Sequence, residues 1–195
     1  MGKTKKTLEL ERKLYARTRQ DGYPYGAFEV TLWSNGNGGN GAAYERVDFL
    51  TVDRKGIWRA YEIKVSRADF YSSAAKSFIG NYNYYVMPES LYKEVKQDVP
   101  NHVGVLVEGS FPNSLISIKN AKKTNLGLPV EELYISLICS LNRVADKYHN
   151  NLDKDVVARY RNQANRLKRE NRELRNSIMA CMNCNYKPNK THMRR

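Results

Sequence analysis

The chain has 195 residues, of which 33 are Lys or Arg and 20 are Asp or Glu, so its formal net charge is +13. This length allows one domain with a sizeable core and an appendage. The sequence contains no apolar run of membrane-spanning length and no signal-peptide core at its N-terminus, so we expect no membrane association. Three cysteines are too few for a disulfide framework, which favours a reducing, cytoplasmic environment.

The positive charge is concentrated at the two ends of the chain. Residues 1–20 contain seven Lys or Arg and two Glu, and residues 153–195 contain twelve against four acids, whereas the stretch between them has fourteen of each. Lys and Arg that neutralise phosphates release counterions, so a nucleic acid is one explanation for such ends. A solvated tail without a ligand is the other, and a charge run alone does not decide between them.

The hydrophobic pattern predicts an α/β domain over residues 1–150. An amphipathic helix at 7–20 is followed by strands at 26–33, 47–53 and 57–65. The capping-box residues Ser66 and Asp69 then begin a helix that we expect to reach about Phe78. The remaining expected elements are a strand at 81–87, a short helix at 89–97, strands at 102–108 and 114–119, and a long amphipathic helix at 129–149.

Two of these strands bring acidic residues together. If strands 47–53 and 57–65 form a hairpin, paired positions sum to about 110, which places Asp48 opposite Glu62. Alternate residues of a strand share a face, so Lys64 lies beside Glu62. Opposed carboxylates are destabilising unless a cation lies between them, and Mg²⁺ prefers such oxygen ligands. The pattern therefore predicts a metal site with an ammonium at its edge, and the alternative is an exposed salt-bridge patch worth under about 1 kcal/mol.

This arrangement resembles the PD-(D/E)XK nuclease superfamily, and more closely the MmcB-like DNA-repair family and related phage-encoded nuclease-like proteins. The likeness rests on residues 47–70, 81–95 and 137–143 and extends over about residues 7–150. Val47 stands where the name of the superfamily has proline. The resemblance implies a restriction-endonuclease-like αβββαβ core with a mixed central sheet.

The resemblance also implies a chemistry, which is the metal-dependent hydrolysis of DNA phosphodiester bonds. Asp48 and Glu62 would bind Mg²⁺ or Mn²⁺, and Lys64 would serve the attacking water. The expected setting is DNA processing or repair in a bacterium or in a phage-infected host cell. Relatives that keep such a motif are not all enzymes, so the alternative is a catalytically inactive DNA-binding protein or a protein-interaction inhibitor.

Many superfamily members carry a further acid on the first helix. Glu9 and Glu11 are the candidates here, with Glu11 preferred because it lies nearer the middle of the helix, and Glu29 on the first strand is a third. Sequence alone does not choose among them. Weaker candidates for phosphate contacts are the basic residues Arg67, Lys76, Arg166, Lys168, Arg169 and Arg172.

Residues 151–180 form a basic helical extension whose apolar residues recur at heptad spacing. The a positions are Val157, Ala164, Asn171 and Ile178, and the d positions are Tyr160, Leu167, Leu174 and Cys181. An Asn at an a position favours a parallel two-stranded coil, in which Glu170 and Arg175 could pair between chains. We expect this helix to make a homodimer. The alternatives are a helix folded back on its own domain and a basic helix ordered only on nucleic acid.

Residues 181–195 form a basic tail that contains Cys181, Cys184 and His192. A structural zinc site needs four ligands, and this segment supplies three. We therefore expect free thiols, and a zinc site would require the cysteines of two chains.

Overall fold

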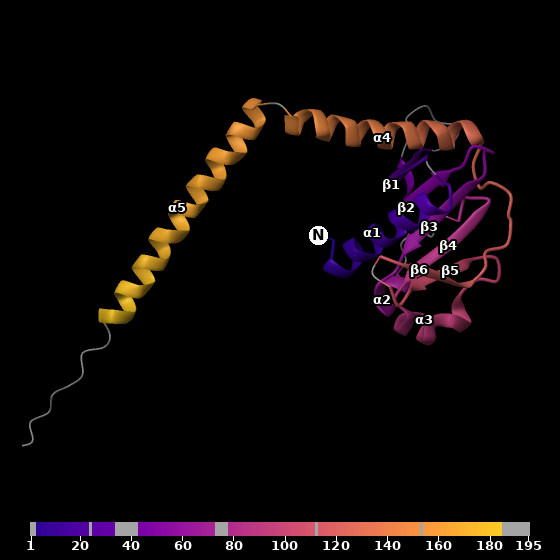
Figure 1. Cartoon of the computed structure of the whole chain (residues 1–195), viewed down its shortest axis with the longest axis horizontal. Coiled ribbons are helices and arrows are strands. Elements are labelled where there is room, and N and C mark those ends of the chain that lie inside the picture. The colour runs from indigo at the N-terminus through magenta and orange to yellow at the C-terminus, as the bar shows by residue number, and fades with distance from the viewer. Residues whose placement is uncertain are drawn as a thin grey trace, which may run out of the picture. The chain divides into compact units, whose positions relative to one another are not determined.

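The computed structural model describes residues 3–23, 25–33, 43–72, 78–111, 113–152 and 154–184. The chain divides into two compact units, residues 1–143 and 144–195, and the boundary lies within a long helix. The first unit is an α/β domain, and the second consists of the end of that helix and the helix after it (Figure 1).

The described elements follow one another in the predicted order. They are α1 (Lys5–Gln20), β1 (Tyr25–Trp33), β2 (Ala43–Val52), β3 (Trp58–Ile63), α2 (Arg67–Phe70), β4 (Tyr82–Met87), α3 (Glu89–Val95), a 3₁₀-helix (Lys96–Asp98), β5 (Gly104–Glu108), β6 (Leu115–Lys119), α4 (Val130–Leu152) and α5 (Lys154–Cys184). Among the helices so described, none is both long and apolar enough to cross a membrane.

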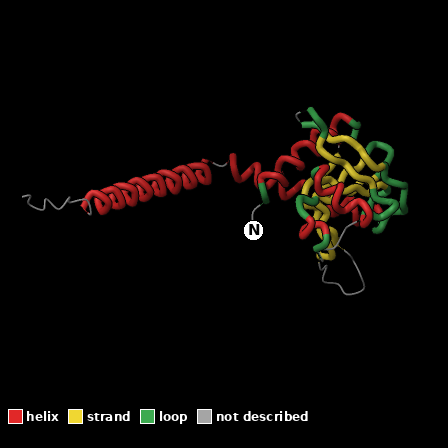
Figure 2. Tube along the Cα trace, turned by 90° about the horizontal axis from the view of Figure 1, so that it is seen from below, coloured by secondary structure: helices red, strands yellow, loops and turns green. Residues whose placement is uncertain are grey.

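The six strands form one mixed sheet in the order β1-β2-β3-β4-β5-β6. The first three strands pair antiparallel, β3, β4 and β5 pair parallel, and β6 returns antiparallel to β5. Figure 2 shows the strands gathered in the middle of the first unit with helices around them. The predicted α/β class with a mixed central sheet is confirmed.

Helix α1 covers one face of the sheet. Its side chains Leu10 and Leu14 are fully buried and belong to the same apolar cluster as Tyr61 and Ile63 of β3. The Thr4 hydroxyl caps the helix by accepting a hydrogen bond from the Thr7 N–H at 3.1 Å. The Leu10 and Leu14 side chains, four residues apart, form the stripe that the amphipathic pattern predicts.

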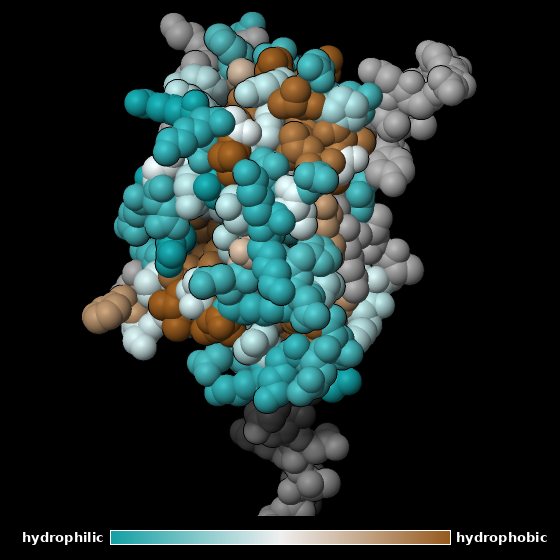
Figure 3. Space-filling view, turned by 90° about the vertical axis from the view of Figure 1, so that its right-hand side faces the viewer, coloured by the Kyte–Doolittle hydropathy of each residue, from teal (hydrophilic) through white to brown (hydrophobic). Residues whose placement is uncertain are grey.

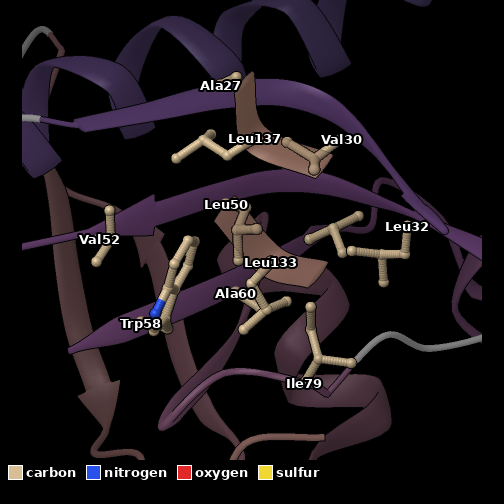
Figure 4. Close-up of a cluster of buried hydrophobic side chains, with 11 residues drawn as sticks. Ala27, Val30, Leu32, Leu50, Val52, Trp58, Ala60, Ile79, Leu133 and Leu137 are labelled. Carbon is tan, nitrogen blue, oxygen red and sulfur yellow. The ribbon is translucent and has the colours of Figure 1, made fainter. Parts of the chain in front are cut away.

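Helices α4 and α3 cover the opposite face. Leu133 and Leu137 of α4 pack with Trp58 and Ala60 of β3 and with other side chains from β1 and β2 (Figure 4). A second cluster joins α3 to β4 and β5. The first unit therefore has three layers, and alternate residues of β3 face different helices.

Helix α2 is shorter than the sequence predicts. Ser66 caps it as expected, because its hydroxyl accepts a hydrogen bond from the Asp69 N–H at 3.2 Å. The prediction that it continues to Phe78 is wrong, since the helix ends at Phe70 and Phe78 is not helical. The Ser72 N–H bonds back to the Asp69 carbonyl, and the Ser72 hydroxyl donates to the same oxygen at 2.8 Å. This local turn ends the helix.

The surface of the first unit is polar over most of one view. Figure 3 shows a largely hydrophilic face on which the apolar side chains form separate patches. Charged side chains near the ends of β2 and β3 are less exposed, and they form the site described below.

Candidate functional site

The hairpin of β2 and β3 has the predicted register. Phe49 pairs with Tyr61 and Thr51 pairs with Arg59, so each pair sums to 110. Asp48 lies one residue beyond the Phe49 pair, and its Oδ2 accepts a hydrogen bond from the N–H of Ile63 at 2.8 Å. This hydrogen bond holds the carboxylate of Asp48, a β2 residue, against β3, the strand that carries Glu62.

The turn between the two strands sets this register. Asp53 Oδ1 accepts hydrogen bonds from the backbone N–H of Lys55 at 2.9 Å and of Ile57 at 3.0 Å. Gly56 has φ +74, a conformation that favours glycine, and Arg59 holds the other Asp53 oxygen at 3.0 Å. A shift of one residue would reverse the face of every side chain, so this turn decides which residues meet.

Asp48 departs from the regular alternation of its strand. Leu50 and Ala60, two residues from each acid, belong to the apolar cluster under α4, but so does Val47, directly before Asp48. The alternation of β2 is therefore interrupted at Asp48, and the strand pattern alone does not give the face of this residue. The Glu62 side chain is buried, with 3% of the residue exposed. The two acids come together because the Asp48 carboxylate reaches β3, where it accepts the hydrogen bond of the Ile63 N–H next to Glu62.

Lys64 is also buried and lies between two carboxylates. Its N–H donates to the carbonyl of Val86 at 2.9 Å, which continues the pairing of β3 with β4. Its Nζ lies 3.8 Å from Glu62 Oε2 and 3.8 Å from Asp69 Oδ1. Asp69 is held in turn, because its Oδ2 accepts a hydrogen bond from the N–H of Val65 at 3.0 Å. The ammonium is close to both acids but lies beyond hydrogen-bonding distance of either.

These side chains line one cleft of about 470 Å³, which we call the acid cleft. It receives residues from α1, β1, β2, β3 and the start of α2. Its lining comprises the acids Glu11, Glu29, Glu45, Asp48, Glu62 and Asp69, the bases Lys3, Arg46 and Lys64, and Thr7 and Ile63. All four predicted catalytic residues, Asp48, Glu62, Lys64 and Glu11, are therefore in one place.

The structure narrows the choice of a further acid. Glu11 and Glu29 both line the acid cleft, whereas Glu9 does not and instead forms an ion pair with Lys13 at 2.7 Å. Lys3 Nζ lies 2.5 Å from Glu11 Oε1 and 2.6 Å from Glu29 Oε1. The cleft thus already accepts one cationic group between two carboxylates.

Glu29 reaches the cleft through an unusual backbone conformation. Its φ is +54 within β1, and it lies between the paired residues Phe28 and Val30. A non-glycine residue in this region is uncommon and costs on the order of 1 kcal/mol or more. Arg143 of α4 holds this point of the strand, because its Nη2 donates to the Glu29 carbonyl and to Ser140 Oγ, each at 2.9 Å. The sequence pattern gave no sign of this contact.

Burial changes the proton affinity of the site. It raises the pKa of Asp48 above its ordinary value, although the hydrogen bond from Ile63 and the charge of Lys64 act in the opposite direction. Burial also raises the pKa of Tyr85, which pairs with Glu62 across β3 and β4, and the charge of Glu62 adds to the effect. The site therefore disfavours further negative charge unless a cation is added.

The donor set fits a hard divalent cation. Within the ranges that the structure describes, no group of three or more His, Cys, Asp or Glu side chains is placed to hold a metal ion by itself. Mg²⁺ commonly binds through one or two carboxylates and keeps several waters, so Asp48 and Glu62 with water are a sufficient set. The position of the Lys3 ammonium between two acids of the same cleft agrees with this chemistry.

Arg67, the predicted phosphate-contact residue that is described in the first unit, does not line the acid cleft. Arg67 is exposed on α2, and its Nη1 lies 3.8 Å from Glu94. Lys76 lies outside the described residues. The remaining four are exposed on α5 in the second unit: Arg166, Lys168, Arg169 and Arg172. Cys181 and Cys184 fall at the end of α5, but their side chains and His192 are not among the described groups.

Comparisons with known proteins support the fold. No protein-family model matches the sequence, and no curated protein matches it. The structure is similar to that of a protein of unknown function from Silicibacter pomeroyi, with a TM-score of 0.53 and 19% sequence identity. The match covers 79% of this chain and 95% of that one. At this identity the likeness shows a shared fold and carries no information about chemistry.

Proposed function

We propose that this protein is a Mg²⁺- or Mn²⁺-dependent nuclease that hydrolyses DNA phosphodiester bonds. The observation that carries the proposal is the meeting of Asp48, Glu62 and Lys64 in the acid cleft, on adjacent strands joined by a hairpin of fixed register. The element order of helix, three strands, helix and strand supports the restriction-endonuclease-like core that the resemblance implies.

Asp48 and Glu62 would hold the metal. A bound divalent ion would supply Lewis-acid stabilisation of the phosphate and lower the pKa of a bound water. The Ile63 N–H holds Asp48 Oδ2, so Oδ1 would be the oxygen that binds the ion. Because Glu62 is buried at the end of β3, its carboxylate is pre-organised and loses little entropy on binding.

Lys64 would act on the reacting groups. Its ammonium is held between Glu62 and Asp69 at distances that leave it free to donate to a water or a phosphate oxygen. In a buried site such a charge stabilises a phosphorane-like transition state more strongly than it would in water. Glu11 and Glu29 are the candidates to bind a further water or cation, since both line the same cleft.

DNA is proposed as the substrate because of where the basic residues lie. The cleft itself is rich in acids, so affinity for a polyanion must come from other surfaces. Exposed basic side chains of α5 can supply it through phosphate contacts: Arg166, Lys168, Arg169 and Arg172. The same observation favours the second candidate function, a DNA-binding protein that keeps the fold without catalysis.

The test is cleavage of single- and double-stranded DNA by the full chain with Mg²⁺ or Mn²⁺, and with EDTA. Glu62→Gln should reduce cleavage by at least about 100-fold, because it removes one charge from the metal site. Glu94→Gln is the matched control, since Glu94 is an exposed acid outside the cleft. An RNA arm of the same design tests the sugar preference.

Metal binding is measured separately, by calorimetric titration of Mn²⁺ into the full-length protein without DNA. Glu62→Gln and Asp48→Asn should each weaken the binding, and Glu94→Gln should not. Cleavage that persists in Glu62→Gln, or that ignores EDTA, rejects the assigned site. Binding to DNA that falls steeply with salt, without any cleavage, supports the second candidate function.

A further inference from the structure

Helix α5 carries an apolar stripe that no other described residue of the second unit covers. The helix spans 31 residues, and every side chain from 157 to 180 is exposed. The large apolar members of the predicted seam are between 48% and 66% exposed: Val157, Tyr160, Leu167, Leu174 and Ile178. Helices in proteins owe most of their stability to the packing of an apolar face. Asparagine is a weak helix former, and α5 has asparagines at 162, 165, 171 and 176. This helix therefore requires a partner.

We propose that the partner is α5 of a second copy of this chain, in a parallel two-stranded coiled coil. The seam residues alternate at spacings of three and four, which is the 3.5-residue period of a left-handed supercoil. A helix packed on a globular surface needs a broader apolar stripe than these a and d positions alone. This inference stands apart from the nuclease proposal, because it uses only residues of the second unit.

The charges beside the seam select the parallel orientation. The e positions are all basic, namely Arg161, Lys168 and Arg175, and the g position between the last two is Glu170. In an antiparallel pair, e positions face e positions, so three basic residues would meet three others. In a parallel pair, each g position faces the following e position of the partner helix. Glu170 of each copy then pairs with Arg175 of the other, which gives two ion pairs per dimer.

Asn171 supplies a second argument for this orientation. It occupies an a position in the middle of the seam, and in the single chain its Nδ2 donates to the Leu167 carbonyl at 3.1 Å. In a parallel pair in register, the two Asn171 side chains lie opposite each other and can bond across the interface. A shift by one heptad would place each asparagine against Ala164 or Ile178, which leaves polar groups buried without partners.

The first test is the mass of the full chain by light scattering on a size-exclusion column, over a range of concentrations. We expect a dimer whose dissociation constant rises at least about tenfold in Leu174→Ala, because two leucines per dimer lose buried surface. Met179→Ala is the matched control. Met179 is apolar and 59% exposed, close to the 62% of Leu174, but it lies at a b position off the seam.

The second test determines the orientation. Arg175→Glu places two like charges opposite each other in a parallel pair and should raise the dissociation constant several-fold. In an antiparallel pair the same change relieves repulsion between e positions and should lower it. Glu170→Arg combined with Arg175→Glu restores the parallel pairing and should recover the affinity of the unchanged chain.

A cross-link gives an independent readout. In a background with Cys139, Cys181 and Cys184 changed to serine, Val157→Cys should form a disulfide-linked dimer on mild oxidation, since a positions of parallel helices are adjacent. A dimer that does not cross-link at this position contradicts the parallel orientation. A chain that remains monomeric at all concentrations, with Leu174→Ala matching Met179→Ala, overturns the proposal and favours a helix folded back on its own domain.

Discussion

Two groups of charged side chains in the first unit, both of which include residues of α1, behave in opposite ways. In the first, Lys13 Nζ lies 2.6 Å from Glu108 and 2.7 Å from Glu9, and Lys6 Nζ lies 2.7 Å from the other Glu108 oxygen. We call these four residues the closed network, because each charge has a partner within hydrogen-bonding distance.

The acid cleft is arranged differently. Lys64 lies 3.8 Å from each of its two acids, and the cleft contains six acids against three bases. Burial alone would raise the pKa of Glu108, yet the hydrogen bonds from Lys13 and Lys6 hold it below its usual value. At Asp48 the effect of burial prevails and raises the pKa.

The opposite pKa shifts of Glu108 and Asp48 imply opposite effects on the stability of the folded domain. Folding favours the charged form of Glu108 and disfavours the charged form of Asp48, so ionised Glu108 stabilises the domain and ionised Asp48 destabilises it. Sites that bind ligands commonly carry such a cost. The following variants test this contrast, from the largest expected effect to the smallest.

Lys64→Met should be the most damaging change. It removes a buried ammonium beside the buried Glu62 carboxylate, and breaking such a pair by deleting one partner costs about 3–5 kcal/mol in the free energy of unfolding. Urea denaturation measures the loss. Combining it with Glu62→Gln removes both charges and should recover most of the stability. A double variant as unstable as the sum of the two single variants would show that the residues are not coupled.

Glu108→Gln should destabilise the domain by about 1–2 kcal/mol at pH 7, since Lys6 and Lys13 each lose a charged partner. The pKa of Glu108 is lower in the folded chain than its ordinary value of 4.5, so its contribution is present above that pH and is lost as the pH falls through the folded value. The variant and the unchanged chain should therefore converge in acid. A constant difference at all pH values would assign the loss to packing.

Asp48→Asn should stabilise the domain at pH 7, whereas Glu108→Gln destabilises it. Because the pKa of Asp48 is raised above 3.8 by folding, its charged form costs stability at higher pH, and that cost disappears as the pH falls below 3.8. The amide keeps an oxygen for the Ile63 N–H, so we expect a gain of up to about 2–4 °C in Tm at pH 7 without metal. Added Mg²⁺ should raise the Tm of the unchanged chain only. A lower Tm for the variant at pH 7 would show that ionised Asp48 stabilises the domain, as Glu108 does.

Lys93→Ala should have the smallest effect. Lys93 forms an ion pair with Glu89 at 2.8 Å on α3, but both side chains are more than half exposed. Exposed pairs of this kind contribute about 0.3–0.5 kcal/mol, so thermal unfolding should change within error. A loss comparable to that of Glu108→Gln would mean that short distances, rather than burial, set the energy of these pairs.

The sequence predicted those features that depend on local spacing. The hairpin register followed from the turn that contains Gly56, and the cap followed from Ser66 and Asp69, because each rests on residues close in the chain. The end of α2 at Phe70 was not predictable, since a serine hydroxyl turned back on the helix decides it. The entry of Lys3 into the acid cleft depends on how the start of α1 packs on the sheet, which no local pattern specifies. Glu29 was a candidate from the sequence, but its left-handed backbone was not predictable.

The position of Glu29 in the wall of the acid cleft depends on its left-handed backbone conformation. The guanidinium that holds its carbonyl comes from a residue 114 positions along the chain, on the helix that closes the opposite layer. Glycine adopts this φ without strain, so Glu29→Gly would relieve the backbone and at the same time remove one acid from the cleft. A substitution chosen to stabilise this strand would therefore also change the composition of the cleft.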